Sequence, residues 1–170
     1  MRRGAVAAFA AAVAAIAVSA ASGDVGLSET ATSTTASFSA TLNGSDKTAT
    51  YTIPLTVADL RGTGAGWNLT ITSTQLAAGA YTLPTSASSV TAVSKSCSVS
   101  PCTNPTNSVT YPVTVPAGSG PPTAVRFYNA AAGTGKGTFT VTPTIKVAVG
   151  ANAYKGSYSS TITLAIVSGP

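Results

Sequence analysis

Apolar and polar residues alternate along most of the chain after residue 35, and this period of two is typical of strands with one buried face. Gly, Asn and Pro residues separate the alternating segments, and no helical period follows the first twenty residues. We therefore predict an all-β fold, an antiparallel, immunoglobulin-like β-sandwich. The expected strands are 36–42, 48–57, 67–72, 89–94, 109–115, 124–128, 137–141, 145–149 and 158–167. The first two read as a hairpin around the turn at Asn43 to Asp46.

The first residues have the pattern of a secretory signal peptide. A basic start, Met1-Arg2-Arg3, precedes an apolar run from Ala5 to Val18, and small residues around Ala20 and Ala21 suit a signal peptidase. The run is shorter than the ~20 residues of a membrane span, which disfavours the alternative of a retained anchor. We predict a helical signal peptide over 1–21, a flexible Ser/Thr-rich lead-in over 22–35 and one domain over 36–170. The protein is then secreted, and extracellular or associated with the cell wall.

Charge and titratable groups exclude several classes of function. Only 8% of residues are charged, and the net charge of +5 falls to +3 without Arg2 and Arg3. The remaining basic residues are scattered, so neither nucleic acid nor, after signal cleavage, a membrane is an expected partner. The chain has no histidine and only four carboxylates, Asp24, Glu29, Asp46 and Asp59. We therefore expect no catalysis, no cofactor and no metal site.

Two cysteines, Cys97 and Cys102, are separated by four residues. In an exported chain this arrangement predicts a disulfide that closes a small loop. A redox pair needs two intervening residues, and no histidine or further cysteine completes a zinc site. A structural disulfide that closes this loop is the favoured interpretation.

A glycine-rich turn between two predicted strands contains the only tryptophan. Its residues, Asp59-x-Arg61-Gly62 followed by Trp67-x-Leu69, resemble the proximal motif of the WxL domain, a secreted bacterial module associated with binding to cell-wall surfaces. The last predicted strand is similar to the distal motif of that family, with Leu164 where the motif has tryptophan. The resemblance covers about residues 30 to 170. The motif residues are Asp59, Arg61, Gly62, Gly64, Gly66, Trp67 and Leu69 in the proximal part and Tyr158, Ile162, Leu164, Ile166 and Pro170 in the distal part.

The residues leave two roles open for the motif. Trp67 is either a core residue between two sheets, which we favour, or a ring that stacks on glycan. Asp59 and Arg61 share a face, so an ion pair that stabilises the turn is favoured over a role in ligand recognition. The glycines suit positive φ angles or close backbone approach. Residues 126–128 are the best secondary patch for stacking on glycan, although their alternation equally suits an ordinary strand.

The resemblance implies a protein that binds the cell wall non-covalently, with wall glycan or other surface proteins as partners. The alternative is a structural subunit of a surface layer or fibre that assembles by strand addition at a sheet edge. The sequence leaves the oligomeric state open.

Overall fold

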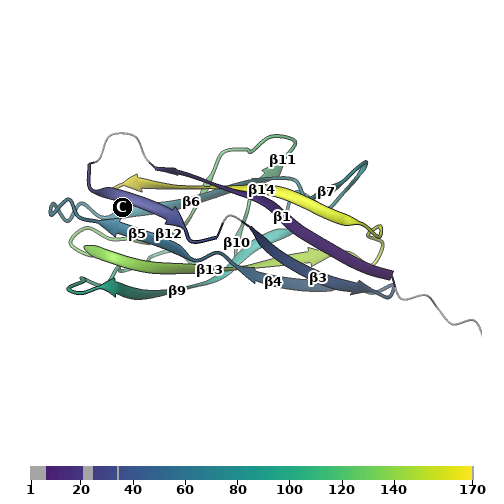
Figure 1. The fold of residues 1–170 in the computed structure, drawn as a ribbon, viewed down its shortest axis with the longest axis horizontal. Helices are drawn as coiled ribbons and strands as arrows, with labels where there is room; N and C mark the ends of the chain where they lie inside the picture. Colours follow the sequence, from purple (N-terminus) through teal and green to yellow (C-terminus); the bar gives the residue numbers. More distant parts are fainter. Residues whose placement is uncertain (1–6, 21–24, 34, 170) are drawn as a thin grey trace, which may run out of the picture.

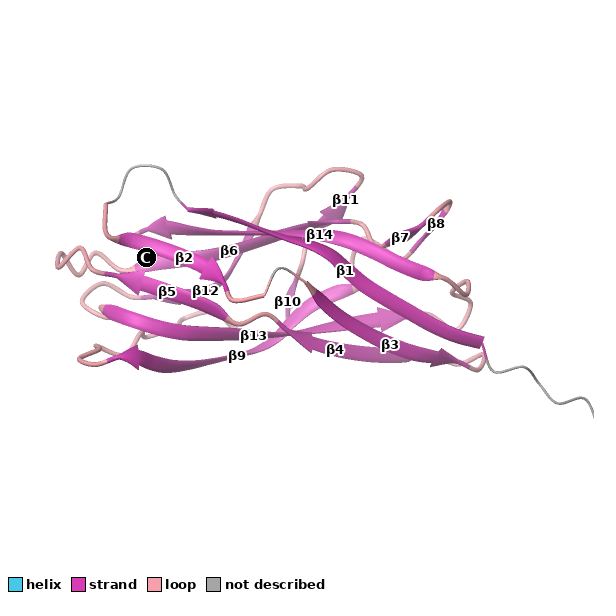
Figure 2. Cartoon of the chain, viewed as in Figure 1, coloured by secondary structure: helices cyan, strands magenta, loops and turns pink. Residues whose placement is uncertain are grey.

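The computed structural model describes residues 7–20, 25–33 and 35–169, which fold into two β-sheets (Figure 1). Sheet A contains β1 (Ala7–Ala20), β3 (Ala36–Leu42), β6 (Trp67–Thr74), β7 (Ala77–Ala78), β8 (Tyr81–Thr82), β11 (Ala117–Gly118), β12 (Val125–Ala130) and β14 (Ser157–Ser168). Sheet B contains β2 (Leu27–Ala31), β4 (Lys47–Thr52), β5 (Leu55–Asp59), β9 (Ser88–Val99), β10 (Val113–Thr114) and β13 (Gly137–Val149). Figure 2 shows no helix in the described part of the chain, so the all-β prediction is confirmed.

The core lies where the inner faces of the two sheets meet. Buried and less buried residues alternate along β13 and β14, as expected for strands that present every second side chain to the core. Phe127, Phe139 and Trp67 are among the largest fully buried side chains. The core therefore draws on the aliphatic and aromatic positions that the alternation indicated.

Sheet A is not purely antiparallel, which corrects the sequence-based prediction, whereas the described strand pairs of sheet B are all antiparallel. Sheet A has the order β11-β6-β14-β1-β3, and in it β1 runs parallel to β14 and β11 runs parallel to β6. Sheet B has the order β10-β9-β13-β5-β2. Parallel neighbours need long connections, and both parallel pairs join strands that are far apart in the sequence. The alternation of side chains does not reveal the direction of such a pair.

Residues 7–20 form a strand instead of the predicted signal helix. β1 lies between β14 and β3, with Ala10 opposite Ser157 and Ala20 opposite Ile166, and with Ala7 opposite Leu42. Figure 1 shows this long strand beside β14, with β3 on its other side. A strand in this place satisfies backbone N–H and C=O groups of both neighbours, which a helix does not. Part of the predicted cleavage region, residues 21–24, lies outside the described residues.

The segment predicted as a flexible lead-in also contains a strand. Leu27–Ala31 form β2 and pair antiparallel with β5 through Leu27 opposite Asp59. The burial pattern of β2 alternates, with Leu27 and Glu29 facing the core. Among the described residues no helix is long and apolar enough to cross a membrane.

The turn at Asn43 to Asp46 connects the two sheets instead of closing a hairpin. β3 pairs with β1 in sheet A, whereas β4 pairs with β13 in sheet B. The predicted strand 48–57 is broken at Pro54 into β4 and β5, both of which pair with β13. A proline supplies no N–H to a ladder, and the break places Pro54 where no such donor is needed. β13 continues through Pro143 and joins two predicted strands into one.

The predicted disulfide between Cys97 and Cys102 is confirmed. It closes the turn after β9, at the end of sheet B where β13 begins, because Cys97 lies opposite Phe139. Val99, inside the loop, is exposed. The bond therefore fixes a surface turn next to the core.

Candidate functional site

The structure brings the two sequence motifs together. β6 and β14 are antiparallel neighbours, with Trp67 opposite Ser168, Leu69 opposite Ile166 and Ile71 opposite Leu164. Residues that are about a hundred positions apart in the sequence are thus joined in one ladder. We call this unit, residues 59–69 together with residues 162–169, the motif unit. Tyr158 lies near the start of β14, before the motif unit, and Pro170 lies outside the described residues.

Trp67 is a core residue in the structure. Its side chain has no exposed surface, and its indole Nε1–H donates a hydrogen bond of 2.9 Å to the Gly135 carbonyl oxygen. The Tyr128 ring is tilted against it with the ring centroids 5.9 Å apart. A buried tryptophan whose N–H is satisfied contributes apolar burial without leaving a polar group unpaired. In this conformation the ring cannot stack on a ligand.

Gly135 is a residue that sequence reasoning missed. Its φ angle is +71°, and a Cβ atom at this position would lie 2.8 Å from Trp67 Nε1. Only glycine allows the backbone to approach the indole so closely and to present its carbonyl oxygen to the ring. No local signal distinguishes this glycine from its neighbours Gly133 and Gly137 in the sequence.

Arg61 connects the turn to the C-terminal strand. Its Nε lies 2.9 Å from Asp59 Oδ1 and its Nη2 lies 3.0 Å from Asp59 Oδ2, so the ion pair is bidentate. Nη2 also donates to the Gly66 carbonyl oxygen at 2.8 Å, and Nη1 donates to Ser168 Oγ. Both side chains are almost completely buried. The expected turn-stabilising pair is therefore present and also holds the end of β14.

The remaining motif residues support the same unit. Gly62, Gly64 and Gly66 all have positive φ angles, as the turn was expected to require. The Gly66 carbonyl oxygen also accepts a hydrogen bond of 3.1 Å from the Gly169 N–H. Leu164, which stands where the distal motif has tryptophan, is fully buried. A leucine at this place keeps an apolar core contact while the aromatic ring is lost.

The secondary patch at 126–128 is not an exposed aromatic surface, which corrects the prediction. Phe127 and Tyr128 are both buried, and the segment before β10 lies against β12, where the Tyr111 hydroxyl donates to the Phe127 carbonyl oxygen at 2.8 Å. Burial raises the pKa of Tyr128 to about 12. Arg126 Nη1 donates to Asn68 Oδ1 at 3.2 Å.

The described carboxylates Asp46 and Asp59 make contacts that stabilise the fold. Asp46 Oδ1 accepts a hydrogen bond from the Ala151 N–H at 2.8 Å, and Asp59 is held by Arg61. Glu29 is buried, and neither of its carboxylate oxygens has a hydrogen-bond partner within the described residues. Burial raises the pKa of Glu29 to about 8, an increase that the nearby Ile166 backbone amide partly opposes. In the described part of the chain, no three potential metal ligands gather.

The comparison with protein families gives one match, described as the WxL domain surface cell wall-binding family, over residues 17–170. No curated protein is similar enough to match the chain. The family match covers β2 to β14 and both motifs, and the motif unit shows how the two motifs meet. The chain therefore belongs to the WxL family of surface cell wall-binding domains, a non-catalytic family that acts at the cell wall.

Proposed function

We propose that the domain binds the glycan strands of peptidoglycan non-covalently and has no catalytic role. The observation that carries this proposal is the family match over residues 17–170, a range that spans the proximal motif and the strand similar to the distal motif. The sparse charge of the chain supports an uncharged wall polymer over nucleic acid or a membrane as the partner. Other surface proteins are a second class of partner.

The geometry supports a structural role for the motif residues within this function. The side chains of Trp67, Asp59 and Arg61 are almost completely buried. Trp67 bonds to Gly135 in the loop before β13, and Arg61 bonds to Asp59, to Gly66 and to Ser168 at the end of β14. We propose that they hold β6, the turn before it and the end of β14 in place, and that the wall contacts other surface residues. On this view the loss of the distal tryptophan leaves binding intact, because Leu164 fills the same core position.

The test uses purified peptidoglycan sacculi and the secreted, processed chain. We expect the protein to sediment with the sacculi at low and at high salt, because little of its attraction is electrostatic. A tube without sacculi controls for self-sedimentation. Protein that remains wholly in the supernatant at low salt would overturn the proposal.

The processed form itself is part of the proposal. We propose that residues 1–21 act as a signal peptide and are removed on export, and that the remaining domain has an immunoglobulin-like topology. The basic start, the apolar run and the small residues at 20 and 21 support the first statement. Two facing sheets support the second.

A second candidate function is favoured by the place of β1. This strand consists of residues that the signal peptide contains, and it pairs with β14 on one side and β3 on the other. Its removal leaves the edge of β14 without a partner from Ser157 to Ile166. Exposed strand edges recruit strands from other chains. We propose that the processed protein can also act as a subunit of a surface assembly that fills this edge with a strand from a second copy.

A further inference from the structure

Tyr81 and Tyr154 are the exposed aromatic side chains of the described structure, with 46% and 60% of their surface accessible. Tyr81 follows the tight turn between β7 and β8, and Tyr154 lies in the loop between β13 and β14. Their rings stack face to face, with centroids 3.9 Å apart and planes inclined by 17°. Two loops that are distant in the sequence thus present one aromatic platform to solvent.

A cleft of about 450 Å³ lies beside this platform. This volume falls within the ~300–1,000 Å³ range of small-ligand sites. Both tyrosines line it, together with Gln75, Thr82 and Asn152, and Tyr158 forms part of the same lining. The cleft therefore combines aromatic faces with side-chain amides and hydroxyls.

The walls of the cleft are held in place independently of the tyrosine pair. Gln75 Nε2 donates to the Leu83 carbonyl oxygen at 2.6 Å, and the Leu83 N–H donates to the Leu76 carbonyl oxygen at 2.9 Å. Tyr158, which is buried, donates its hydroxyl to the Tyr154 carbonyl oxygen at 3.1 Å. Because these bonds already fix the hairpin and the loop, the exposed rings are preorganised for a ligand.

The chemistry of the lining favours a neutral sugar. No charged side chain lines the cleft, whereas an anionic polymer needs arginine or lysine side chains. Within the described residues, no hydrogen bond uses the Asn152 amide or the hydroxyls of Tyr81 and Tyr154. Aromatic faces contact the apolar C–H face of a sugar ring, and amides and hydroxyls bond its hydroxyl or acetamido groups.

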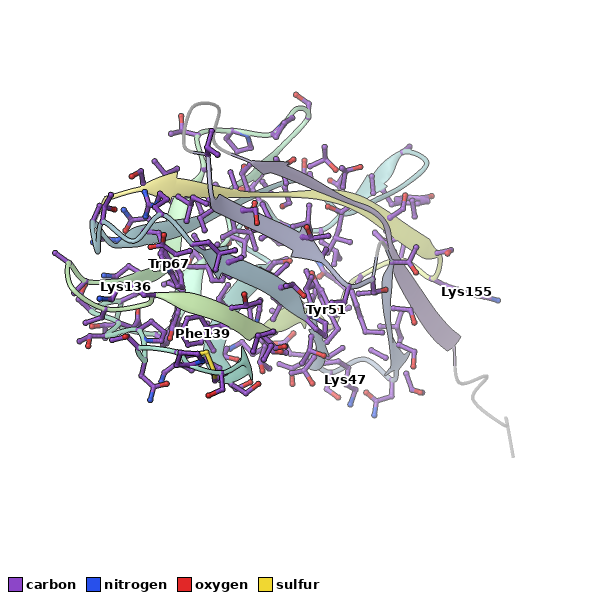
Figure 3. All side chains as sticks on the ribbon, turned by 60° about the vertical axis from the view of Figure 1, so that its left-hand side comes forward. Lys47, Tyr51, Trp67, Lys136, Phe139 and Lys155 are labelled. Atoms are coloured by element: carbon purple, nitrogen blue, oxygen red, sulfur yellow. A yellow bond between two sulfur atoms is a disulfide. The ribbon has the colours of Figure 1, made fainter. Side chains whose placement is uncertain are left out.

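We propose that this cleft, formed by Tyr81, Tyr154 and Asn152, is the subsite that holds a neutral, N-acetylated wall glycan. The assignment rests on the proposed function and adds the place of contact to it. The cleft lies at the other end of β14 from Trp67, since its lining includes Tyr158 near the start of that strand, and Figure 3 shows Trp67 and Lys155, the residue after Tyr154, on opposite sides of the molecule. The 12 residues of β14 separate the cleft from the Trp67 end of the fold. At about 3.3 Å per residue this separation is roughly 35–40 Å.

The test compares variants of the processed chain by sedimentation with peptidoglycan sacculi that have been stripped of anionic polymers. We expect Tyr81→Ala combined with Tyr154→Ala to weaken binding at least about tenfold, as truncation of central aromatic contacts does. Tyr81→Phe combined with Tyr154→Phe keeps the rings and most of the binding. Val99→Ala, at another exposed apolar residue, is the matched control and leaves binding unchanged.

Trp67 emission provides the second readout. It stays the same in all variants, because Trp67 lies at the other end of the fold, and this shows that they are folded. Sacculi that bind wild type and the double alanine variant equally would overturn the subsite and leave the proposed function standing. Binding only to unstripped sacculi, lost at high salt, would overturn the neutral-glycan assignment. Absence of wild-type binding to either preparation would overturn the proposed function itself.

Discussion

Gly135 is the residue on which the position of the tryptophan depends most directly. A methyl group at Gly135 would lie 2.4 Å from Ala130 Cβ and 2.8 Å from Trp67 Nε1 in a backbone with φ +71°. We expect Gly135→Ala to lower the free energy of unfolding by about 2–4 kcal/mol, through overpacking and left-handed strain together. The measurement is urea denaturation followed by Trp67 fluorescence.

A neighbouring glycine supplies the matched control for this prediction. Gly133 has φ +81°, and a Cβ atom there meets nothing within 4 Å. Gly133→Ala therefore carries the backbone strain alone, about 1–2 kcal/mol. Equal losses for both variants would mean that the contacts of a Cβ atom at Gly135 with Ala130 and the indole are unimportant.

Glu29 makes stability depend on pH. Its pKa rises from 4.5 to about 8 in the folded chain because the carboxyl is buried. Between these values the folded state binds one proton more than the unfolded state, so the free energy of unfolding decreases as pH rises. The decrease is roughly 3–5 kcal/mol between pH 4.5 and 8, at about 1.4 kcal/mol per unit.

The test compares the free energy of unfolding of the full-length wild type with that of the full-length Glu29→Gln variant at several pH values. Glu29→Gln keeps the shape of the side chain and replaces the titratable carboxyl with a neutral amide, so we expect this variant to lose most of that slope and to be the more stable protein at pH 8. A wild-type slope that persists in Glu29→Gln would assign the pH dependence to other groups.

At the scale of strands, local patterns identify the elements and not their partners. The alternation in 36–42 and in 48–57 correctly indicates strands, but the turn between β3 and β4 passes from one sheet to the other. A turn sequence specifies a change of direction, and the choice between a hairpin and a crossover depends on which edge is available. The sequence also hides the continuity of β13, because Pro143 normally interrupts a strand.

The motif unit shows the same division between local and distant information. The spacing of Asp59 and Arg61 is sufficient to predict their ion pair, because residues two apart share a face. The bond from Arg61 to Ser168 and the bond from Trp67 to Gly135 join distant segments. Such contacts follow from the strand order, which the sequence does not specify. The exposed tyrosines were missed for this reason, since only the fold brings Tyr81 to Tyr154.

At the scale of the whole molecule, processing changes the sheet. In the full chain β1 covers the edge of β14 and contacts β2. In the chain 22–170 we expect those backbone amides of residues 157–166 that point toward β1 to exchange faster with deuterium at low protein concentration, because an edge strand lacks one set of ladder bonds. The full chain, kept unprocessed, is the control.

Protein concentration decides what fills the edge of β14. If a second copy supplies the strand, chain 22–170 associates as its concentration rises, and the amides of residues 157–166 become protected in step with association. β3 offers a competing outcome, because it lies antiparallel to β1 and could close directly on β14. Size-exclusion chromatography with light scattering separates the two, since closure by β3 gives a monomer at every concentration. A monomer whose β14 amides are as protected as those of the full chain would refute strand addition and leave wall binding as the function of a self-contained domain.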